Sequence, residues 1–153
     1  AVQSKNKPTL LVMTRQGLPE LEGTTVEGAE KGGYVIAGDV NTADTILMGT
    51  GSEVHLLVEA QKQLGEKVAV VSLPSWELFE AQTAEYKESV LPKRITKRLA
   101  IEAGASLGWY KYVGTEGQVI GIDRFGASAP GDLLLKEYGM SVENILETVK
   151  QLG

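Results

Sequence analysis

The stretch Asp44–Leu64, DTILMGTGSEVHLLVEAQKQL, decides the fold class of this chain. Its apolar run Ile46–Met48 is too short for a helix and is followed by Gly49 and Gly51, which is typical of a buried strand that ends in a turn. After the turn, apolar residues recur at the spacing of an amphipathic helix. A strand, a glycine turn and a helix in this order form half of a βαβ unit.

The same alternation of strands and helices continues on both sides of this stretch. Short apolar runs predict further strands at residues 34–37, 67–73, 97–102 and 119–122. Helical patterns lie between and after them, and the last of these is capped by Ser141. Strands that alternate with helices predict an α/β domain with a mainly parallel sheet.

The first part of the chain has a different organisation. Thr9–Met13 is a short apolar run that predicts a buried strand, and it leads into the turn Thr14–Pro19. Residues 20–32 are interrupted by glycines and have little hydrophobic period, so we expect a surface linker there. The chain therefore divides into a lone strand with its turn, a linker and a complete α/β unit.

Composition excludes several classes of protein. The chain has 153 residues, of which 42% are hydrophobic and 23% charged, as expected for a globular domain with a sizeable core. The net charge is -5 and no segment is strongly basic, so we do not expect nucleic acid as a partner. The absence of cysteine excludes disulfides and thiolate metal sites and fits a reducing compartment. No apolar stretch is long enough for a bilayer and no signal peptide is recognisable, so we expect no membrane contact.

The turn at Gly49, Thr50, Gly51 and Ser52 is a candidate anion site. It carries part of the glycine pattern of dinucleotide-binding turns, but Val54 stands at the third glycine position. No acidic residue ends the following strand, where one would bind a ribose. A helix start can still hold an anion with its free N–H groups. The simpler interpretation is that the glycines only allow a tight strand–helix connection.

We expect no catalytic residue and no metal site in this chain. Ser52 lacks the glycine spacing of a hydrolase elbow, and His55 follows it on the same helix, where it is poorly placed to act as its base. One histidine without cysteine leaves no classical zinc site. Glu102 ends a predicted strand, where a partnered polar role or a subunit contact is a better interpretation than catalysis.

Arg15 is the residue best placed to touch a ligand. It follows an apolar strand within a turn, where a guanidinium group can hold a phosphate through two hydrogen bonds. A solvated surface arginine is the alternative, and composition does not decide between the two. The aromatic residues around Trp76 and Trp109 are too scattered in the sequence to predict a platform for stacking bases.

Five segments together resemble the C-terminal part of the transketolase family. They are Thr14–Pro19, Gly49–Val54, Val71–Pro74, Ile101–Gly104 and Ile122–Pro130. The resemblance covers essentially the whole chain. No single segment is decisive, but the ordered set is specific, and the last segment, IDRFGASAP, is the most diagnostic.

The resemblance implies a fold and a division of the chain. Residues 28–153 would form the C-terminal domain, a Rossmann-like three-layer α/β unit with a mostly parallel, mixed sheet of about five strands. Residues 1–27 would be the tail of the preceding pyrimidine-binding domain and a linker. The arginine that matches Arg15 holds the substrate phosphate in the family.

The resemblance also implies a function for the parent enzyme. Transketolases are cytoplasmic homodimers of the pentose phosphate pathway that transfer a two-carbon ketol unit between sugar phosphates, using thiamine diphosphate and a divalent metal (Mg or Ca). The N-terminal and middle domains that hold this cofactor are missing here, apart from the tail of the middle domain within residues 1–27. The chain alone is therefore expected to be inactive and to bind no cofactor, with a scaffolding and dimer-support role.

Two alternatives remain open from the sequence. The chain could be a stand-alone α/β module that binds a nucleotide or another anion at Gly49–Ser52. It could also be the last domain of a related thiamine enzyme, such as a 2-oxoacid dehydrogenase β-subunit or a deoxyxylulose-phosphate synthase. The segment Asp123–Pro130, DRFGASAP, favours transketolase over both related families.

Overall fold

A five-stranded sheet with the order β1-β3-β2-β4-β5 forms the middle layer of the computed structural model, which describes residues 4–152. The strands are β1 Tyr34–Ala37, β2 Thr45–Gly49, β3 Val68–Ser72, β4 Lys97–Ile101 and β5 Gln118–Ile120. β2 pairs in parallel with both β3 and β4, and β5 pairs in parallel with β4. β1 is antiparallel to β3. The predicted α/β class with a mostly parallel, mixed sheet is confirmed.

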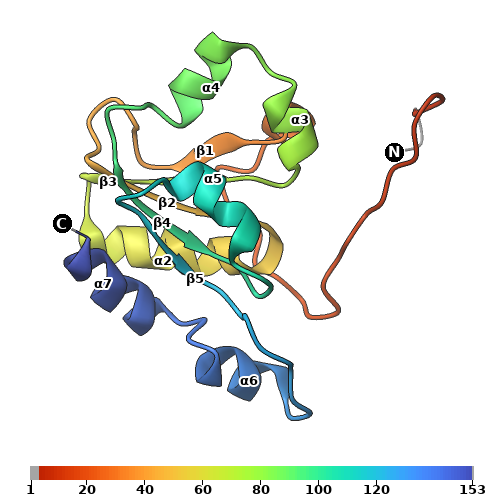
Figure 1. Ribbon diagram of the computed structural model, residues 1–153, viewed down its shortest axis with the longest axis vertical. Coiled ribbons are helices and arrows are strands. Elements are labelled where there is room, and N and C mark those ends of the chain that lie inside the picture. Colours follow the sequence, from red (N-terminus) through yellow and green to blue (C-terminus); the bar gives the residue numbers. More distant parts are fainter. Residues whose placement is uncertain (1–3, 153) are drawn as a thin grey trace.

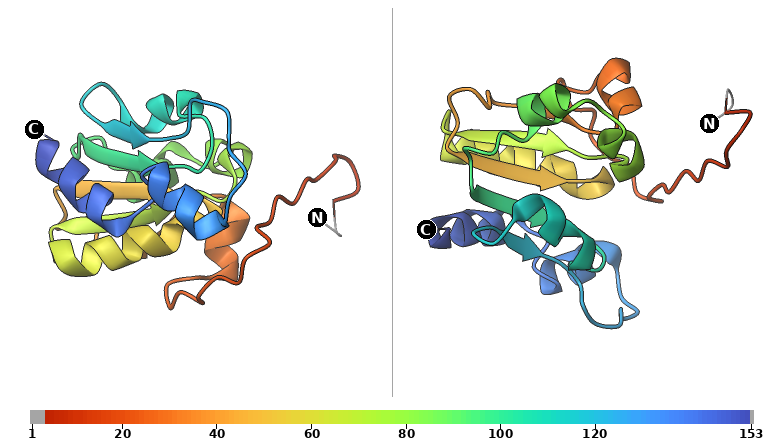
Figure 2. Two further views of the ribbon diagram at one scale, coloured as in Figure 1. Left: turned by 90° about the horizontal axis from the view of Figure 1, so that it is seen from below. Right: turned by 45° about the horizontal axis from the view of Figure 1, so that its top comes forward.

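Helices cover both faces of this sheet (Figures 1 and 2). They are α1 Val26–Lys31, α2 Val54–Leu64, α3 Trp76–Glu80, α4 Ala84–Val90, α5 Tyr110–Val113, α6 Gly131–Glu137 and α7 Val142–Gln151. Short 3-10 turns, η1 Gly51–Glu53 and η2 Leu107–Trp109, precede α2 and α5. Within residues 4–152, no helix has the length and apolar character needed to cross a membrane.

One face of the sheet packs on an aromatic cluster. Ile46 and Met48 of β2 point into this core, which α3, α4 and α5 close. The ring centroid of Trp76 lies 5.0 Å from that of Trp109 and 5.2 Å from that of Tyr112. Aromatic residues that looked scattered in the sequence therefore come together, but in the interior, where they cannot form a platform for bases.

The opposite face packs on α2 and α7. Leu47 of β2, Leu57 of α2 and Ile145 of α7 are all fully buried in this second core. The apolar periodicity of the opening stretch thus buries the predicted side of α2. The predicted cap of α7 is confirmed, since the Ser141 hydroxyl accepts a hydrogen bond of 3.2 Å from the Asn144 N–H.

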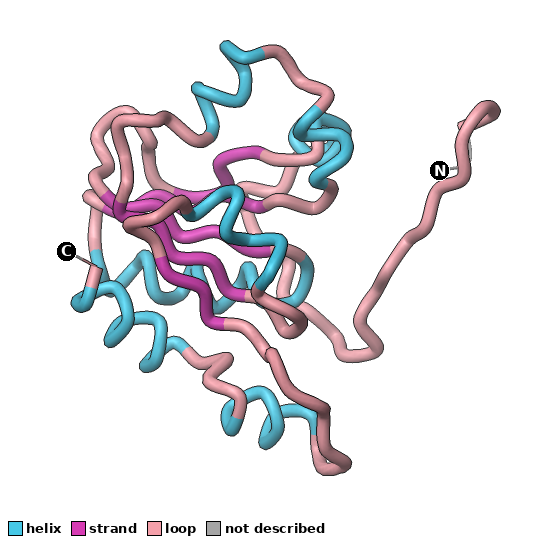
Figure 3. Tube along the Cα trace, viewed as in Figure 1, coloured by secondary structure: helices cyan, strands magenta, loops and turns pink. Residues whose placement is uncertain are grey.

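The segment before the domain differs from the expected buried strand. Residues 9–13 contain no strand (Figure 3), and the side chains of Leu10, Val12 and Met13 are 86%, 87% and 82% exposed. A strand needs a neighbour for its N–H and C=O groups, and no strand of residues 4–152 pairs with this segment. The apolar run is extended, but the predicted burial is wrong for this chain.

The expected linker at 20–32 contains a helix. The Thr25 hydroxyl accepts a 3.0 Å hydrogen bond from the Gly28 N–H and begins α1. Gly32 ends it with φ of 80°, and a Cβ atom there would lie 2.3 Å from the Ser75 carbonyl oxygen. Glycines that suggested a loop are needed at the end of a helix and for its close packing on α3.

Candidate functional site

Arg15 lies on the exposed segment that leads to the domain. The Thr14 hydroxyl donates to the Gln16 side-chain oxygen at 2.6 Å and accepts from the Gln16 N–H at 3.3 Å, which fixes the bend around Arg15. Arg15 itself is exposed and makes no ion pair with another residue of the described chain. The guanidinium group is thus available to a ligand. This exposure is expected both for a phosphate-binding arginine and for a solvated surface arginine.

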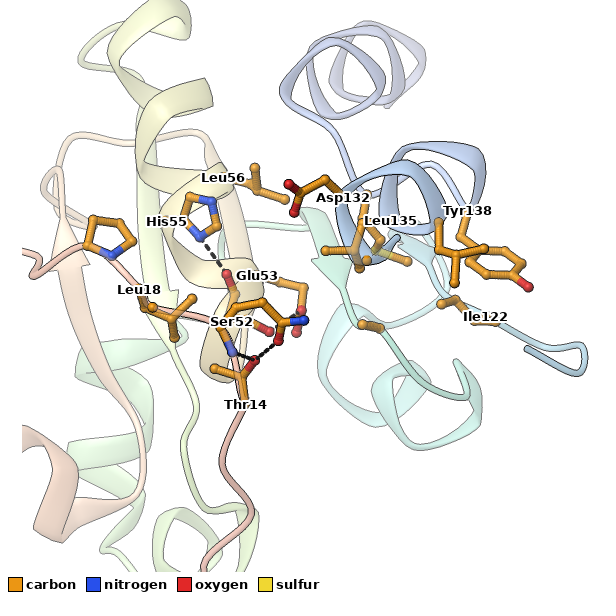
Figure 4. A pocket seen from close by; sticks show the side chains of 17 residues that line it. Thr14, Leu18, Ser52, Glu53, His55, Leu56, Ile122, Asp132, Leu135 and Tyr138 are labelled. Atoms are coloured by element: carbon orange, nitrogen blue, oxygen red, sulfur yellow. Dashed lines mark hydrogen bonds between the residues drawn. The ribbon is translucent and has the colours of Figure 1, made fainter. Parts of the chain in front are cut away.

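A cavity lies between this segment, the start of α2 and α6 (Figure 4). Its volume is about 590 Å³, within the range of small-molecule sites. It is lined by Thr14, Gln16, Gly17, Leu18, Pro19, Ser52, Glu53, His55, Leu56, Ala103, Ile122, Gly131, Asp132, Leu134, Leu135, Tyr138 and Met140. Arg15 is not among them, so the structure does not bring it together with the Gly49–Ser52 turn at this cavity.

The Gly49–Ser52 turn is built as a tight strand–helix connection. β2 ends at Gly49, and Gly51 opens the turn η1 with φ of 59°. The side chain of Thr50 does not cap the turn, so its first N–H groups have no side-chain acceptor from that residue. A buried carboxylate, that of Glu53, follows directly. Anion binding at Gly49, Thr50, Gly51 and Ser52 stays a prediction, and the nearby negative charge opposes it.

Ser52 and His55 do not form a catalytic pair. The Ser52 hydroxyl donates to the Glu53 carboxylate at 2.5 Å. His55 Nδ1 lies 2.5 Å from the Ser52 carbonyl oxygen, so the ring contacts the backbone and not the hydroxyl. A base must reach the proton that it abstracts, and this geometry does not place His55 at the serine hydroxyl.

Two carboxylates gather where β2 and β4 end. The side chain of Glu53 is only 5% exposed, and that of Glu102 is partly buried. Trp109 Nε1 donates to Glu102 Oε2 at 3.3 Å, which gives Glu102 the partnered polar role expected from its position. Sequence reasoning missed Glu53, because a glutamate at the start of a helix is normally solvated.

The pKa of Glu102 reports on this arrangement. Burial raises the pKa of the Glu102 carboxyl above its usual range, and the negative charge of Glu53 raises it further. The hydrogen bond from the Trp109 N–H acts in the opposite direction. The effect of burial is desolvation, and the effect of Glu53 is repulsion between like charges. The two carboxylates therefore interact electrostatically.

Glu102→Gln is expected to stabilise the chain more at neutral pH than at acidic pH. With the folded-state pKa above the unfolded-state value of about 4.3, the charged carboxylate destabilises the fold above the folded-state pKa. That cost disappears as the pH falls toward the unfolded-state value, where both states are protonated. Urea unfolding of both proteins at about pH 7 and about pH 4.5 measures the difference.

A matched variant corrects this experiment for the loss of one negative charge. Glu147→Gln removes a carboxylate from the exposed face of α7. After this correction, a gain in stability that is the same at both pH values, or larger at acidic pH, would contradict the assigned environment of Glu102.

Comparisons with known proteins show which family this chain resembles. Residues 32–141 match the family described as "Transketolase-like TK C-terminal domain". Transketolase from Nostoc sp. is 56% identical over 96% of this chain, and transketolase from Halalkalibacterium halodurans is 52% identical over 99% of it. These matches extend beyond the domain into the exposed segment that carries Arg15.

Solved transketolases have the same fold. The enzyme from Leishmania mexicana superposes with a TM-score of 0.83 at 38% identity, over 90% of this chain and 20% of its own. The enzyme from Pichia stipitis in complex with sedoheptulose-7-phosphate superposes with a TM-score of 0.82 at 40% identity, over the same shares of the two chains.

The chain spans about a fifth of its relatives, 22% of the Nostoc enzyme and 24% of the Halalkalibacterium enzyme. The agreement with the family model covers most of the α/β unit, from the end of α1 to the start of α7. The alternative of a stand-alone anion-binding module, suggested by the partial glycine pattern, does not explain sequence identity to transketolases along nearly the whole chain. The chain belongs to the transketolase family and corresponds to its C-terminal domain.

Proposed function

We propose that the parent enzyme transfers a two-carbon ketol unit between sugar phosphates in the pentose phosphate pathway. The observation that carries this proposal is the 56% identity to a transketolase over 96% of the chain. The Pichia stipitis relative, solved with sedoheptulose-7-phosphate, supports sugar phosphates as the substrate class. The same relationship supports a cytoplasmic homodimer, to which this domain contributes packing surface.

The cofactor of such an enzyme would be held outside this chain. Thiamine diphosphate needs a divalent metal to neutralise its diphosphate, and metals of that type bind to clustered oxygen ligands. Among residues 4–152, no group of three or more His, Cys, Asp or Glu side chains could hold a metal ion. We propose that thiamine diphosphate and its Mg or Ca ion are held by the N-terminal and middle domains of the parent enzyme.

Arg15 is the residue of this chain that we propose to touch substrate. It is exposed, and the bend Thr14–Gln16 fixes its backbone at the end of an apolar segment. We propose that residues 1–27 close the middle domain and that 28–153 form the C-terminal domain. Helix α1, Val26–Lys31, spans this boundary and would fix the linker to the domain. Pairing of the exposed residues 9–13 with the middle domain would place Arg15 beside the substrate.

The isolated 153-residue chain is expected to show no ketol transfer. It carries the proposed phosphate ligand but spans only 22% of the Nostoc enzyme, and we expect the domains that hold thiamine diphosphate to lie in the rest of the parent enzyme. Coupled assays of the chain and of the parent enzyme, with the same sugar phosphates and cofactor, make the comparison. Turnover by the chain alone would overturn the assigned role, and an inactive, cofactor-loaded parent would overturn the proposed function.

A further inference from the structure

Glu53 is a buried carboxylate without a counter-charge in the described chain. Its side chain is 5% exposed, and its hydrogen-bond partner is the neutral hydroxyl of Ser52. No lysine, arginine or histidine of residues 4–152 forms an ion pair with it. Buried charges are normally paired, because removal from water costs free energy that a single neutral hydrogen bond does not return.

The cavity above Glu53 has the lining of a binding site for a cation. Most of its lining is apolar, contributed by Leu56, Leu134 and Leu135 among others. The carboxylates in the lining are those of Glu53 in η1 and Asp132 in α6, and no lysine or arginine of the described chain lines the cavity. In Figure 4 the Asp132 side chain extends from α6 toward α2, so the acids approach the cavity from different elements.

Neighbouring groups strengthen the negative potential. Glu102 directly follows the last residue of β4, the strand next to β2, and the charge of Glu53 contributes to the raised pKa of the Glu102 carboxyl. The ring of His55 faces the same cavity and contacts the Ser52 carbonyl oxygen. Backbone N–H groups at the start of α2 partly offset the charge of Glu53, as they do for acids at helix N-termini in general. These N–H groups do not fill the cavity of about 590 Å³ that Glu53 lines, so a ligand can still reach its carboxylate.

We propose that this cavity binds a cationic group, an ammonium or guanidinium on a short aliphatic stem, with Glu53 as its primary ligand. The stem would pack on the leucine side chains of α2 and α6, and Asp132 would favour a second positive charge at the rim. The cation is a free metabolite of this type or a lysine or arginine side chain from the rest of the parent enzyme. This proposal does not depend on the ketol-transfer activity.

Agmatine, which carries a guanidinium and an ammonium group on a four-carbon stem, is the probe. Titrated into the isotope-labelled 153-residue chain, it is expected to shift the amide resonances of residues 52–56 and 131–135 in a saturable manner. Glu53→Gln keeps the shape of the side chain and an acceptor for Ser52, and is expected to weaken agmatine binding by roughly tenfold or more. Glu59→Gln removes the same charge from an exposed position of α2 outside the cavity and should leave the affinity unchanged.

The outcomes separate the alternatives. No saturable shift at these residues with agmatine, equal weakening by Glu53→Gln and Glu59→Gln, or stronger shifts with inorganic phosphate would overturn the proposal. Agmatine binding by both the chain and the parent enzyme supports a free ligand. Binding by the chain alone supports a side chain of the parent that already occupies the cavity. Failure of ketol transfer in the parent would not alter any of these results.

Discussion

Replacing Trp109 with alanine is expected to lower the free energy of unfolding by about 3–5 kcal/mol. The Trp109 side chain is fully buried and packs edge-on against Trp76, with ring centroids 5.0 Å apart. Its Nε1 also donates to Glu102, so the substitution creates a cavity and removes the hydrogen-bond donor of a partly buried carboxylate. Urea unfolding followed by circular dichroism measures the loss.

Two variants divide this loss into its parts. Trp109→Phe retains most of the ring contacts with Trp76 and Tyr112 but removes the N–H donor, so it is expected to cost about 1–3 kcal/mol. Tyr110→Ala changes the next residue, whose side chain is 55% exposed, and should cost less than about 1 kcal/mol. Equal losses for Trp109→Ala and Tyr110→Ala would mean that the aromatic cluster does not stabilise the domain.

The central elements could be predicted because their residues carry the information locally. Strand β2 is buried along its whole length, and its residues 46–48 form an uninterrupted apolar run. α2 shows a helical period because one side of it, including Leu57, is buried on the sheet. In these elements the pattern of apolar residues agrees with the tertiary contacts, so the sequence is sufficient to predict the strand and the helix.

Two segments could not be predicted because their structure depends on distant parts. Residues 9–13 have the composition of a buried strand, but burial requires a neighbouring strand that residues 4–152 do not supply. The glycines of 20–32 suggest a loop, yet Gly28 packs on Tyr34 and Gly32 packs on α3. Composition records that a residue is small, not which neighbour requires it to be small.

The candidate site was predictable only in part for the same reason. Arg15 was found from its place after an apolar run, a local signal. Glu53 was missed because its burial arises where the start of α2 meets the end of the sheet and α6 lies opposite, far along the sequence. The partner of Glu102 could not be named either, since the chain must turn back between β4 and η2 for the Trp109 N–H to reach the carboxylate.

In the parent enzyme, Arg15→Ala is expected to lower kcat/KM for phosphorylated substrates by roughly 10- to 150-fold. A charge-assisted hydrogen bond between a guanidinium group and a phosphate is worth about 1.5–3 kcal/mol, and this is the interaction that the substitution would remove. The residue is exposed on a segment outside the folded core, so the stability of the domain should not change. Steady-state kinetics with a sugar phosphate as donor and another as acceptor measure the effect.

Substrates without phosphate provide a control that distinguishes phosphate binding by Arg15 from a structural role of this residue. If Arg15 holds the phosphate, Arg15→Ala should leave kcat/KM for an unphosphorylated ketol donor and acceptor within a factor of about 3 of the wild type. Arg15→Lys keeps the charge but loses the planar fork, so its loss with phosphorylated substrates should be intermediate. Equal losses with both kinds of substrate would show that the variant disturbs the segment and not phosphate binding. An unchanged kcat/KM for the phosphorylated pair would refute the assignment, because a ligand of the substrate phosphate cannot be removed without cost.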